Sequence, residues 1–504
     1  MVYNNTATLT LELTGTAILS SSKGTIFAGN VNFTAPGIKL YNTTFNGTAT
    51  ITKNGASSDI LDGADVFNST AIITNSGTGY LLIAGAETYN GNVTFVKSGS
   101  GAIYSGWGAY TDTFAGDLTV TNTVGTVTFG SYGTIAGFSK ATGTQVLTTN
   151  GSTIPKLTHS GAGTLQLAST LTVNNTLTNS AGTLDLNGNT LVATSATFSN
   201  DNGTISLNGN ETITGLTQDA THGTFLYDGT SGPYTLKNYT YNNLTINGVA
   251  TTFNLPANLD VNGNLTVTSG TLDATASNYT LNVGGNWSNA GTFTARSGTV
   301  TLDGTSQKVF GATSFYNLTK DVSATSADTL LFQQSNTQAI AANGTLTLKG
   351  ASGKILTLNG CDAAGTLTSG DPKWGLNVSN TGTTVTADYV NVKDSDASAG
   401  KAIAQTNSTD SGNNLNWVFD IIPAVPTVTG VGGDSASAWS TSDTTPSITL
   451  TLDENGDCRA SELDDSYDLA SDDIDCTGDG TQSITCQMGT LAESASKIIY
   501  VACN

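Results

Sequence analysis

The chain has 504 residues, of which 37% are hydrophobic and only 11% are charged; 38 acidic side chains against 17 basic ones give a formal net charge of −21. This composition predicts a folded chain, with room for several domains or for one long repeat structure and an appended module. The acidic balance excludes binding to a nucleic-acid backbone as an expected function, and no apolar run approaches the length of a membrane-spanning helix.

The first 160 residues carry an aromatic residue that returns at nearly constant spacing. Steps of 22, 22 and 25 residues separate its successive positions, which are Phe45, Phe67, Tyr89 and Phe114. Such spacing is typical of solenoid repeats. Between these positions apolar and polar residues alternate and end at Asn-Gly or Ser-Gly, a pattern that predicts short strands joined by turns.

A longer repeat follows from about residue 160 to residue 418. Leu171–Asp185 matches Leu259–Asp273 at an offset of 88, and Tyr241–Thr245 resembles Phe315–Thr319 at an offset of 74. We interpret residues 1–418 as an all-β parallel β-helix, in which stacking buries the apolar face of each coil. An array of β-sandwiches and an antiparallel barrel would show the same alternation, so both stay open at this point.

The composition changes after residue 418. Residues 419–426 contain two prolines and are predicted to be a linker, and residues 427–504 are predicted to form a small Ig-like or fibronectin-type β-sandwich. Such a module is expected to continue with one more strand. The tail is therefore interpreted as a fragment or, alternatively, as a sheet edge that accepts a strand from a partner.

The five cysteines are unevenly distributed. Cys361 is expected to be a buried free thiol, whereas four cysteines lie close together in the tail, namely Cys458, Cys476, Cys486 and Cys503. Two disulfides and an oxidising compartment follow from this clustering, with three possible connectivities. We favour one bond between Cys458 and Cys503 and another between Cys476 and Cys486. A zinc site is the competing interpretation, but none of the cysteine spacings is C-x2-C.

The segment 259–318 contains GNLTVTSGTL, NVGGNWSNAGTF and GTVTLDGTSQKVFG. It resembles the β-strand-repeat regions of large bacterial surface and adhesin-like proteins. The resemblance implies a right-handed parallel β-helix. The tail, with Tyr500–Cys503, resembles the Ig-like modules that follow such regions.

One aromatic cluster is a candidate ligand site. Tyr104, Trp107 and Tyr110 lie among glycines and could present flat rings to a glycan. A packing role beneath a loop is the alternative. Paired threonines such as Thr266 with Thr268 suggest a third class, an ice-binding plate, against the ordinary interpretation of solvent-facing strand residues.

Catalytic and metal motifs are weak. His159 and His222 lie in no recognisable motif, and the scattered acids of the repeat are expected to form turns. These acids include Asp185, Asp201, Asp260, Asp273 and Asp303. No metal site and no cofactor are predicted, although calcium in the acid-rich stretch 462–479 stays open; the alternation of Asp453, Asn455 and Asp457 lacks the glycine that an EF-hand needs.

These observations predict a non-enzymatic extracellular protein with a structural or adhesive role at a cell surface. Assembly into fibres by end-to-end stacking or strand donation is part of the expectation. The expected partners are other copies of the chain or cell-surface and matrix components, including glycans, with no nucleic acid. The alternative is a β-helix that binds or cleaves carbohydrate, which for cleavage needs two carboxylates at a defined separation.

Overall fold

The computed structural model describes residues 2–4, 7–108, 110–131, 135–217 and 219–419, and in the tail residues 427–431, 447–456, 458–461, 474–477, 481–487 and 500–503. The chain divides into two compact units. Unit 1 comprises Met1–Ile403 and Ser411–Asn416, and unit 2 comprises Ala404–Asp410 and Trp417–Asn504. Every regular element that the structure describes is a β-strand.

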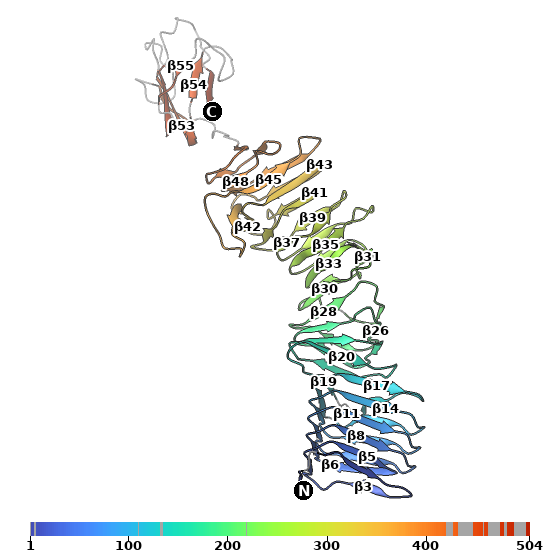
Figure 1. The fold of residues 1–504 in the computed structure, drawn as a ribbon. Coiled ribbons are helices and arrows are strands. Elements are labelled where there is room, and N and C mark those ends of the chain that lie inside the picture. The colour runs from blue at the N-terminus through green and yellow to red at the C-terminus, as the bar shows by residue number, and fades with distance from the viewer. Residues whose placement is uncertain are drawn as a thin grey trace, which may run out of the picture. The chain divides into compact units, whose positions relative to one another are not determined.

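Unit 1 is a parallel β-solenoid of about 18 turns, as the sequence predicts. Figure 1 shows its coils stacked one on the next from the blue to the orange part of the chain. Strands that follow one another by one coil pair in parallel, for example β11 with β14 (Ala71–Asn75 and Val93–Lys97). The interpretations as a sandwich array and as an antiparallel barrel are therefore wrong for this unit.

The strands of unit 1 form five sheets. Sheet I contains β1 (Val2–Tyr3), β4 (Ile26–Phe27), β7 (Thr44–Phe45), β10 (Val66–Phe67), β13 (Thr88–Tyr89), β16 (Thr111–Phe114), β19 (Ile135–Phe138), β21 (Lys156–His159), β24 (Thr176–Asn179) and β27 (Thr197–Ser199). Sheet III contains β3 (Ile18–Ser20), β6 (Gly37–Tyr41), β9 (Asp59–Asp62), β12 (Leu81–Ala84), β15 (Ile103–Trp107) and β18 (Thr128–Ser131). Sheet IV contains β23 (Leu171–Thr172), β26 (Leu191–Val192) and β29 (Ile213–Thr214).

Sheet II continues through nearly all of the coils. It contains β2 (Leu9–Glu12), β5 (Val31–Ala35), β8 (Ala49–Lys53), β11, β14, β17 (Leu118–Asn122), β20 (Thr144–Thr148), β22 (Thr164–Leu167), β25 (Thr183–Asp185), β28 (Thr204–Leu207), β30 (Thr224–Tyr227), β31 (Tyr234–Thr235), β33 (Asn243–Asn254), β35 (Leu265–Asp273), β37 (Trp287–Asn289), β38 (Thr292–Thr294), β40 (Lys308–Phe310), β42 (Asp328–Gln333), β44 (Leu356–Cys361) and β47 (Val390–Val392).

Sheet V completes the later coils. It contains β32 (Thr240–Tyr241), β34 (Leu259–Val261), β36 (Leu281–Val283), β39 (Thr299–Leu302), β41 (Thr313–Asp321), β43 (Thr337–Lys349), β45 (Trp374–Val378), β46 (Thr384–Asp388) and β48 (Ser395–Asp396). The short strands β49 (Ile403–Gln405), β50 (Thr409–Asp410) and β51 (Trp417–Phe419) follow in sequence.

The alternation in the sequence sets which side chains fill the solenoid. In β8, Ala49, Ile51 and Lys53 are buried, whereas Thr50 and Thr52 between them are partly exposed. Successive strand residues point to opposite faces, so the apolar positions face inward. Burial of each inward Ile, Leu or Val stabilises the fold by roughly 1.5–3 kcal/mol.

The recurring aromatic residues form a continuous interior column on sheet I. Their rings are nearly parallel and their centroids lie 5.0–5.4 Å apart from one coil to the next. The column consists of Phe27, Phe45, Phe67, Tyr89, Phe114 and Phe138. The aromatic spacing in the sequence is thus the distance along the chain between equivalent positions of adjacent coils.

Glycines also stack where the turns approach closely. A Cβ at Gly77 would collide with the backbone oxygen of Gly55, and a Cβ at Gly99 would collide with that of Gly77. No residue with a side chain fits these positions unless the turns move apart. The Ser-Gly and Asn-Gly punctuation of the sequence therefore lets one turn lie directly on another.

The strands that the structure describes from residue 427 onward in unit 2 form two three-stranded antiparallel sheets. One has the order β52 (Thr427–Val431), β53 (Ser447–Gly456), β56 (Thr481–Gln487), and the other has the order β55 (Ile474–Asp475), β54 (Cys458–Ser461), β57 (Tyr500–Cys503). Most of the predicted linker 419–426 and the connections between these strands lie outside the described residues.

We predict that Phe67→Ala lowers the free energy of unfolding by about 3–5 kcal/mol, because it leaves a cavity between two stacked rings. Equilibrium denaturation measures this loss. The matched control is Ile72→Ala on the outer face of β11, which should cost far less because Ile72 is 37% exposed. Equal losses in the two variants would contradict the packing described for this column.

Candidate functional site

The three aromatic residues proposed for glycan binding lie in and just after β15. Tyr104 is half-buried, and its ring meets that of Tyr80 edge-on at 6.0 Å between centroids. Tyr110 is 50% exposed and lies against Gly108. The side chain of Trp107 is outside the described residues. Glycan binding at this cluster therefore stays a prediction.

One of the two predicted disulfides joins Cys476 to Cys486. For the other, the backbone register places Cys458 opposite Cys503 on β54 and β57, while their side chains are outside the described residues. Cys361 is a buried free thiol, as expected, and burial raises its pKa. The acid-rich stretch 462–479 and the residues 453–457 proposed for calcium have no described side chains except at Cys476 and Thr477.

His159 is an interior residue that is 1% exposed. The register of β19 and β21 places it directly after Phe138 in the aromatic column. Its Nδ1 lies 2.8 Å from Asn179 Oδ1, and Asn179 Nδ2 donates to Asn200 Oδ1 at 2.8 Å. Burial lowers the pKa of His159, and the hydrogen bond with Asn179 opposes this effect. The aromatic column therefore continues as a polar ladder.

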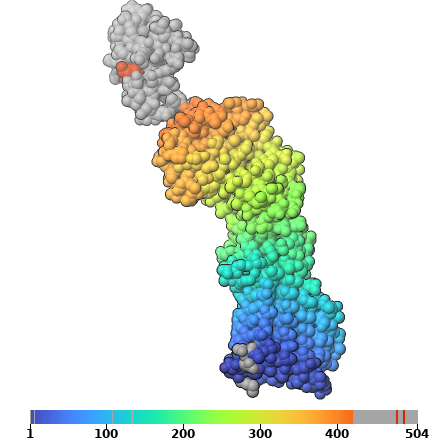
Figure 2. Space-filling view, viewed as in Figure 1, coloured from blue at the N-terminus to red at the C-terminus, as the bar shows by residue number. Residues whose placement is uncertain are grey.

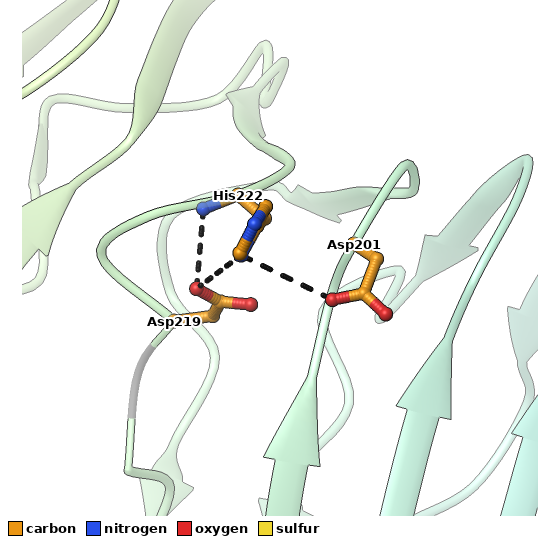
Figure 3. A group of neighbouring side chains, drawn as sticks. All are labelled: Asp201, Asp219 and His222. Carbon is orange, nitrogen blue, oxygen red and sulfur yellow. Dashed lines mark hydrogen bonds and ion pairs between the residues drawn. The ribbon is translucent and has the colours of Figure 1, made fainter.

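His222 lies in an exposed cluster with two aspartates (Figure 3). Its Nδ1 is 3.4 Å from Asp219 Oδ1 in the same loop and 4.0 Å from Asp201 Oδ1 in the preceding coil. An imidazole and two carboxylates are ligand types that suit first-row transition metals. This group is the one set of potential metal ligands found among the described residues.

The hydrogen bonds of Asp219 indicate that this carboxylate caps the loop. Its Oδ1 accepts bonds from Thr221 N at 3.0 Å, Thr221 Oγ1 at 2.8 Å and His222 N at 3.1 Å. Burial raises the pKa of Asp219, but the bonds from Thr221 outweigh this effect and hold it below its ordinary value. The local geometry is thus explained as a loop cap, without a metal.

Three acidic side chains form a second interior column next to the aromatic one. Asp65, Glu87 and Asp112 each precede an aromatic residue of the column by two positions, and all are at most 2% exposed. Thr43 N donates to Asp65 Oδ1 at 2.6 Å, and Glu87 N donates to Asp112 Oδ1 at 3.3 Å. Sequence reasoning missed this column, although its place in the period-two alternation marks it as inward.

Burial gives these acids unusual protonation behaviour. It raises the pKa of Asp65 to about 7, even though the bonds from Thr43 oppose it. It also raises the pKa of Glu87 far above the ordinary value, and the neighbouring Asp112 adds to this effect. Glu87 therefore keeps its proton at neutral pH, although neither of its carboxyl oxygens has a hydrogen-bond partner among the described residues. These carboxyls are sealed inside the coil, where substrates have no access.

Two lysines are buried in the neighbouring column of sheet II. Lys53 Nζ donates to Gly55 O at 2.9 Å and to Gly79 O at 3.1 Å, and Lys97 Nζ donates to Val124 O at 2.7 Å. Burial lowers the pKa of Lys53, against the attraction of Asp59 at 3.9 Å. Through these hydrogen bonds, each ammonium group connects its own coil to a turn of the next coil.

The acids of the later repeat serve mainly as turn and pairing groups. Asp185 Oδ1 accepts a bond from Asn187 N at 2.8 Å, and Asp273 Oδ1 accepts one from Thr275 N at 2.7 Å. Asp273 also forms a bidentate pair with Arg296, which lowers its pKa. Thr266, proposed for an ice-binding row, pairs with Thr245 and Ser288, so that row is not pure threonine.

A groove of about 470 Å³ lies on the outer face of sheet II. It is lined by neutral side chains, many of them hydroxyls and amides, and by one aromatic ring. The lining residues include Thr266, Ser288, Phe310 and Gln333 from successive coils, together with Asn264, Asn286, Asn289 and Ala363. None of the residues that line it is acidic, so it lacks the carboxylate pair that glycosidic cleavage needs.

No family model, no curated protein and no solved structure matches this chain. Among the described residues, no helix is long and apolar enough to span a membrane.

We predict that the acid column makes unit 1 less stable as the pH rises. The folded pKa values are raised, so the stability that these groups contribute is fully present below about pH 4 and is lost above it. For Asp65 the loss is complete near its folded pKa of about 7, and for Glu87 it continues into the alkaline range.

Glu87→Gln should therefore flatten the pH profile and stabilise the protein at alkaline pH. Denaturant unfolding between about pH 4 and pH 9 measures the effect. Glu12→Gln is the control, because Glu12 is exposed. A Glu87→Gln profile that runs parallel to that of the parent protein would show that Glu87 is not protonated in the folded chain.

Proposed function

We propose that this protein is a non-enzymatic, extracellular structural or adhesive protein of a cell surface. Unit 1 serves as a stalk, and residues 427–504 form an Ig-like module. The proposal includes other copies of the chain or matrix components as partners, and assembly into fibres through end-to-end stacking or strand donation.

The observation that carries this proposal is the continuity of sheet II. Its parallel ladder passes through successive coils from β2 to β47, so the hydrogen bonds of each coil support the next. A structure of this kind offers a long outer surface and a closed interior. Such a surface suits display or attachment better than it suits a buried catalytic centre.

The placement of the titratable groups supports the same proposal. The acids with strongly raised pKa values, which would be candidates for acid–base chemistry, lie inside the coil at Asp65, Glu87 and Asp112. The groove on the outer face is lined by neutral groups. The disulfide between Cys476 and Cys486 fits an oxidising, extracellular compartment.

The test uses the full chain on an array that carries both oligosaccharides and matrix proteins. We expect the chain to be retained on at least one class of spot, while the bound saccharides stay intact. Reducing-end and unsaturated-product assays on the same oligosaccharides provide the second readout. Turnover that depends on the added protein would contradict the non-enzymatic role and favour the carbohydrate-cleaving alternative.

A further inference from the structure

The groove on sheet II runs along the stacking direction of the coils. Thr266, Ser288, Phe310 and Gln333 lie on its floor and come from β35, β37, β40 and β42. The register pairs Thr266 with Ser288 and Ser288 with Phe310. Each of these coils therefore contributes one outward side chain to the groove. A ligand that lies across the strands would contact all four, and an extended chain molecule has the shape for this.

A loop borders the groove. Residues 362–373 connect β44 to β45, and Ala363 from this loop lines the groove. A Cβ at Gly365 would lie 3.0 Å from Phe310 Cζ, so the loop touches the ring edge. Asp362 Oδ1 accepts bonds from Ala364 N at 2.9 Å and Thr366 N at 2.8 Å, which fix the loop. Figure 2 shows that unit 1 broadens in its yellow and orange coils, to which this loop belongs.

The amide side chains of the groove are oriented by the backbone. Asn264 Oδ1 accepts a bond from Asn286 N at 2.8 Å, and Asn286 Oδ1 accepts one from Lys308 N at 2.9 Å. Gln333 Oε1 accepts a bond from Gly311 N at 2.8 Å. Their NH₂ groups donate no hydrogen bond to any part of the chain that the structure describes, so three oriented NH₂ groups remain as donors for a ligand.

An acceptor at the same place also lacks a partner. Asn289 is 5% exposed and lines the groove, and its Nδ2 donates to Thr313 Oγ1 at 3.1 Å. Its Oδ1 is buried and accepts no hydrogen bond from the residues described here. A buried acceptor without a donor is destabilising, but this oxygen has no surface that a ligand in the groove could reach.

The chemistry of the lining selects the ligand. No lining residue is charged, and the nearby ammonium of Lys308 lies against Gly365 of the loop, so an anion or a cation would lose its hydration without a counter-charge in the lining itself. Hydroxyl groups both donate and accept hydrogen bonds, as this lining requires, and the C–H face of a sugar packs on the face of an aromatic ring. We propose that this groove binds a neutral oligosaccharide, with Phe310 as the stacking platform; this inference rests on the proposed adhesive function.

The experiment is binding of the full chain to a printed array of neutral hexose and N-acetylhexosamine oligosaccharides, with sialylated and sulfated glycans as the charged arm. The best neutral ligand is then titrated calorimetrically. We expect Phe310→Ala to weaken binding about tenfold, through loss of the stacking platform. Ala290→Arg should also weaken it, because this exposed residue lines the groove and the larger side chain fills it.

Tyr316→Ala is the matched control, since Tyr316 is a half-buried aromatic residue on sheet V. It should leave affinity unchanged, and circular dichroism must show that all variants are folded. The chain could bind matrix proteins or glycans with an affinity that neither Phe310→Ala nor Ala290→Arg weakens. That result would overturn the proposed binding site in the groove and leave the adhesive function supported. A preference for the sialylated and sulfated glycans, or no saccharide binding at all, would also overturn the proposal that the groove binds a neutral oligosaccharide. Cleavage of the bound saccharide would instead overturn the proposed function.

Discussion

The structure of unit 1 depends on one constraint, the in-register parallel pairing of each coil with the next. In such a stack a side chain has its equivalent from the adjacent coils directly above and below it. Ile51 pairs with Phe33 on one side and Ile73 on the other, for example. The side chains therefore pack in columns along the stack. A substitution in one coil changes the packing of the equivalent side chains in the coils before and after it.

Different columns meet this constraint by different physical means. The aromatic column gains from ring packing, and its polar continuation through His159, Asn179 and Asn200 gains from amide hydrogen bonds. The acid column brings carboxyl groups together in a buried interior, where a retained proton avoids the cost of burying neighbouring negative charges. A column of carboxyls thus links the stability of the stack to pH, whereas the aromatic column does not.

The sequence predicted the solenoid because the aromatic spacing repeats the length of a coil, and alternation predicted which residues of strands such as β8 face inward. It did not reveal the acid column, because acidic residues are expected at the surface, and only the phase of Asp65, Glu87 and Asp112 relative to the aromatic residues marks them as inward. The groove could not be predicted either. It depends on the loop 362–373, which approaches the edge of the Phe310 ring and accepts a hydrogen bond from Gln334, so its position depends on contacts distant in sequence. The proposed functions follow from the same division. The closed interior holds the acids whose pKa values are strongly raised, and the groove on the outer face offers neutral hydrogen-bonding groups to partners.

The most direct test of the stacking register is disulfide cross-linking across adjacent coils, followed by peptide mapping. Ile72 and Thr94 are register partners on β11 and β14, whereas Thr119 lies one coil further, on β17. The account predicts that the double variant Ile72→Cys, Thr94→Cys links on mild oxidation and that Ile72→Cys, Thr119→Cys does not. Linkage of the second pair without the first would contradict the in-register stack.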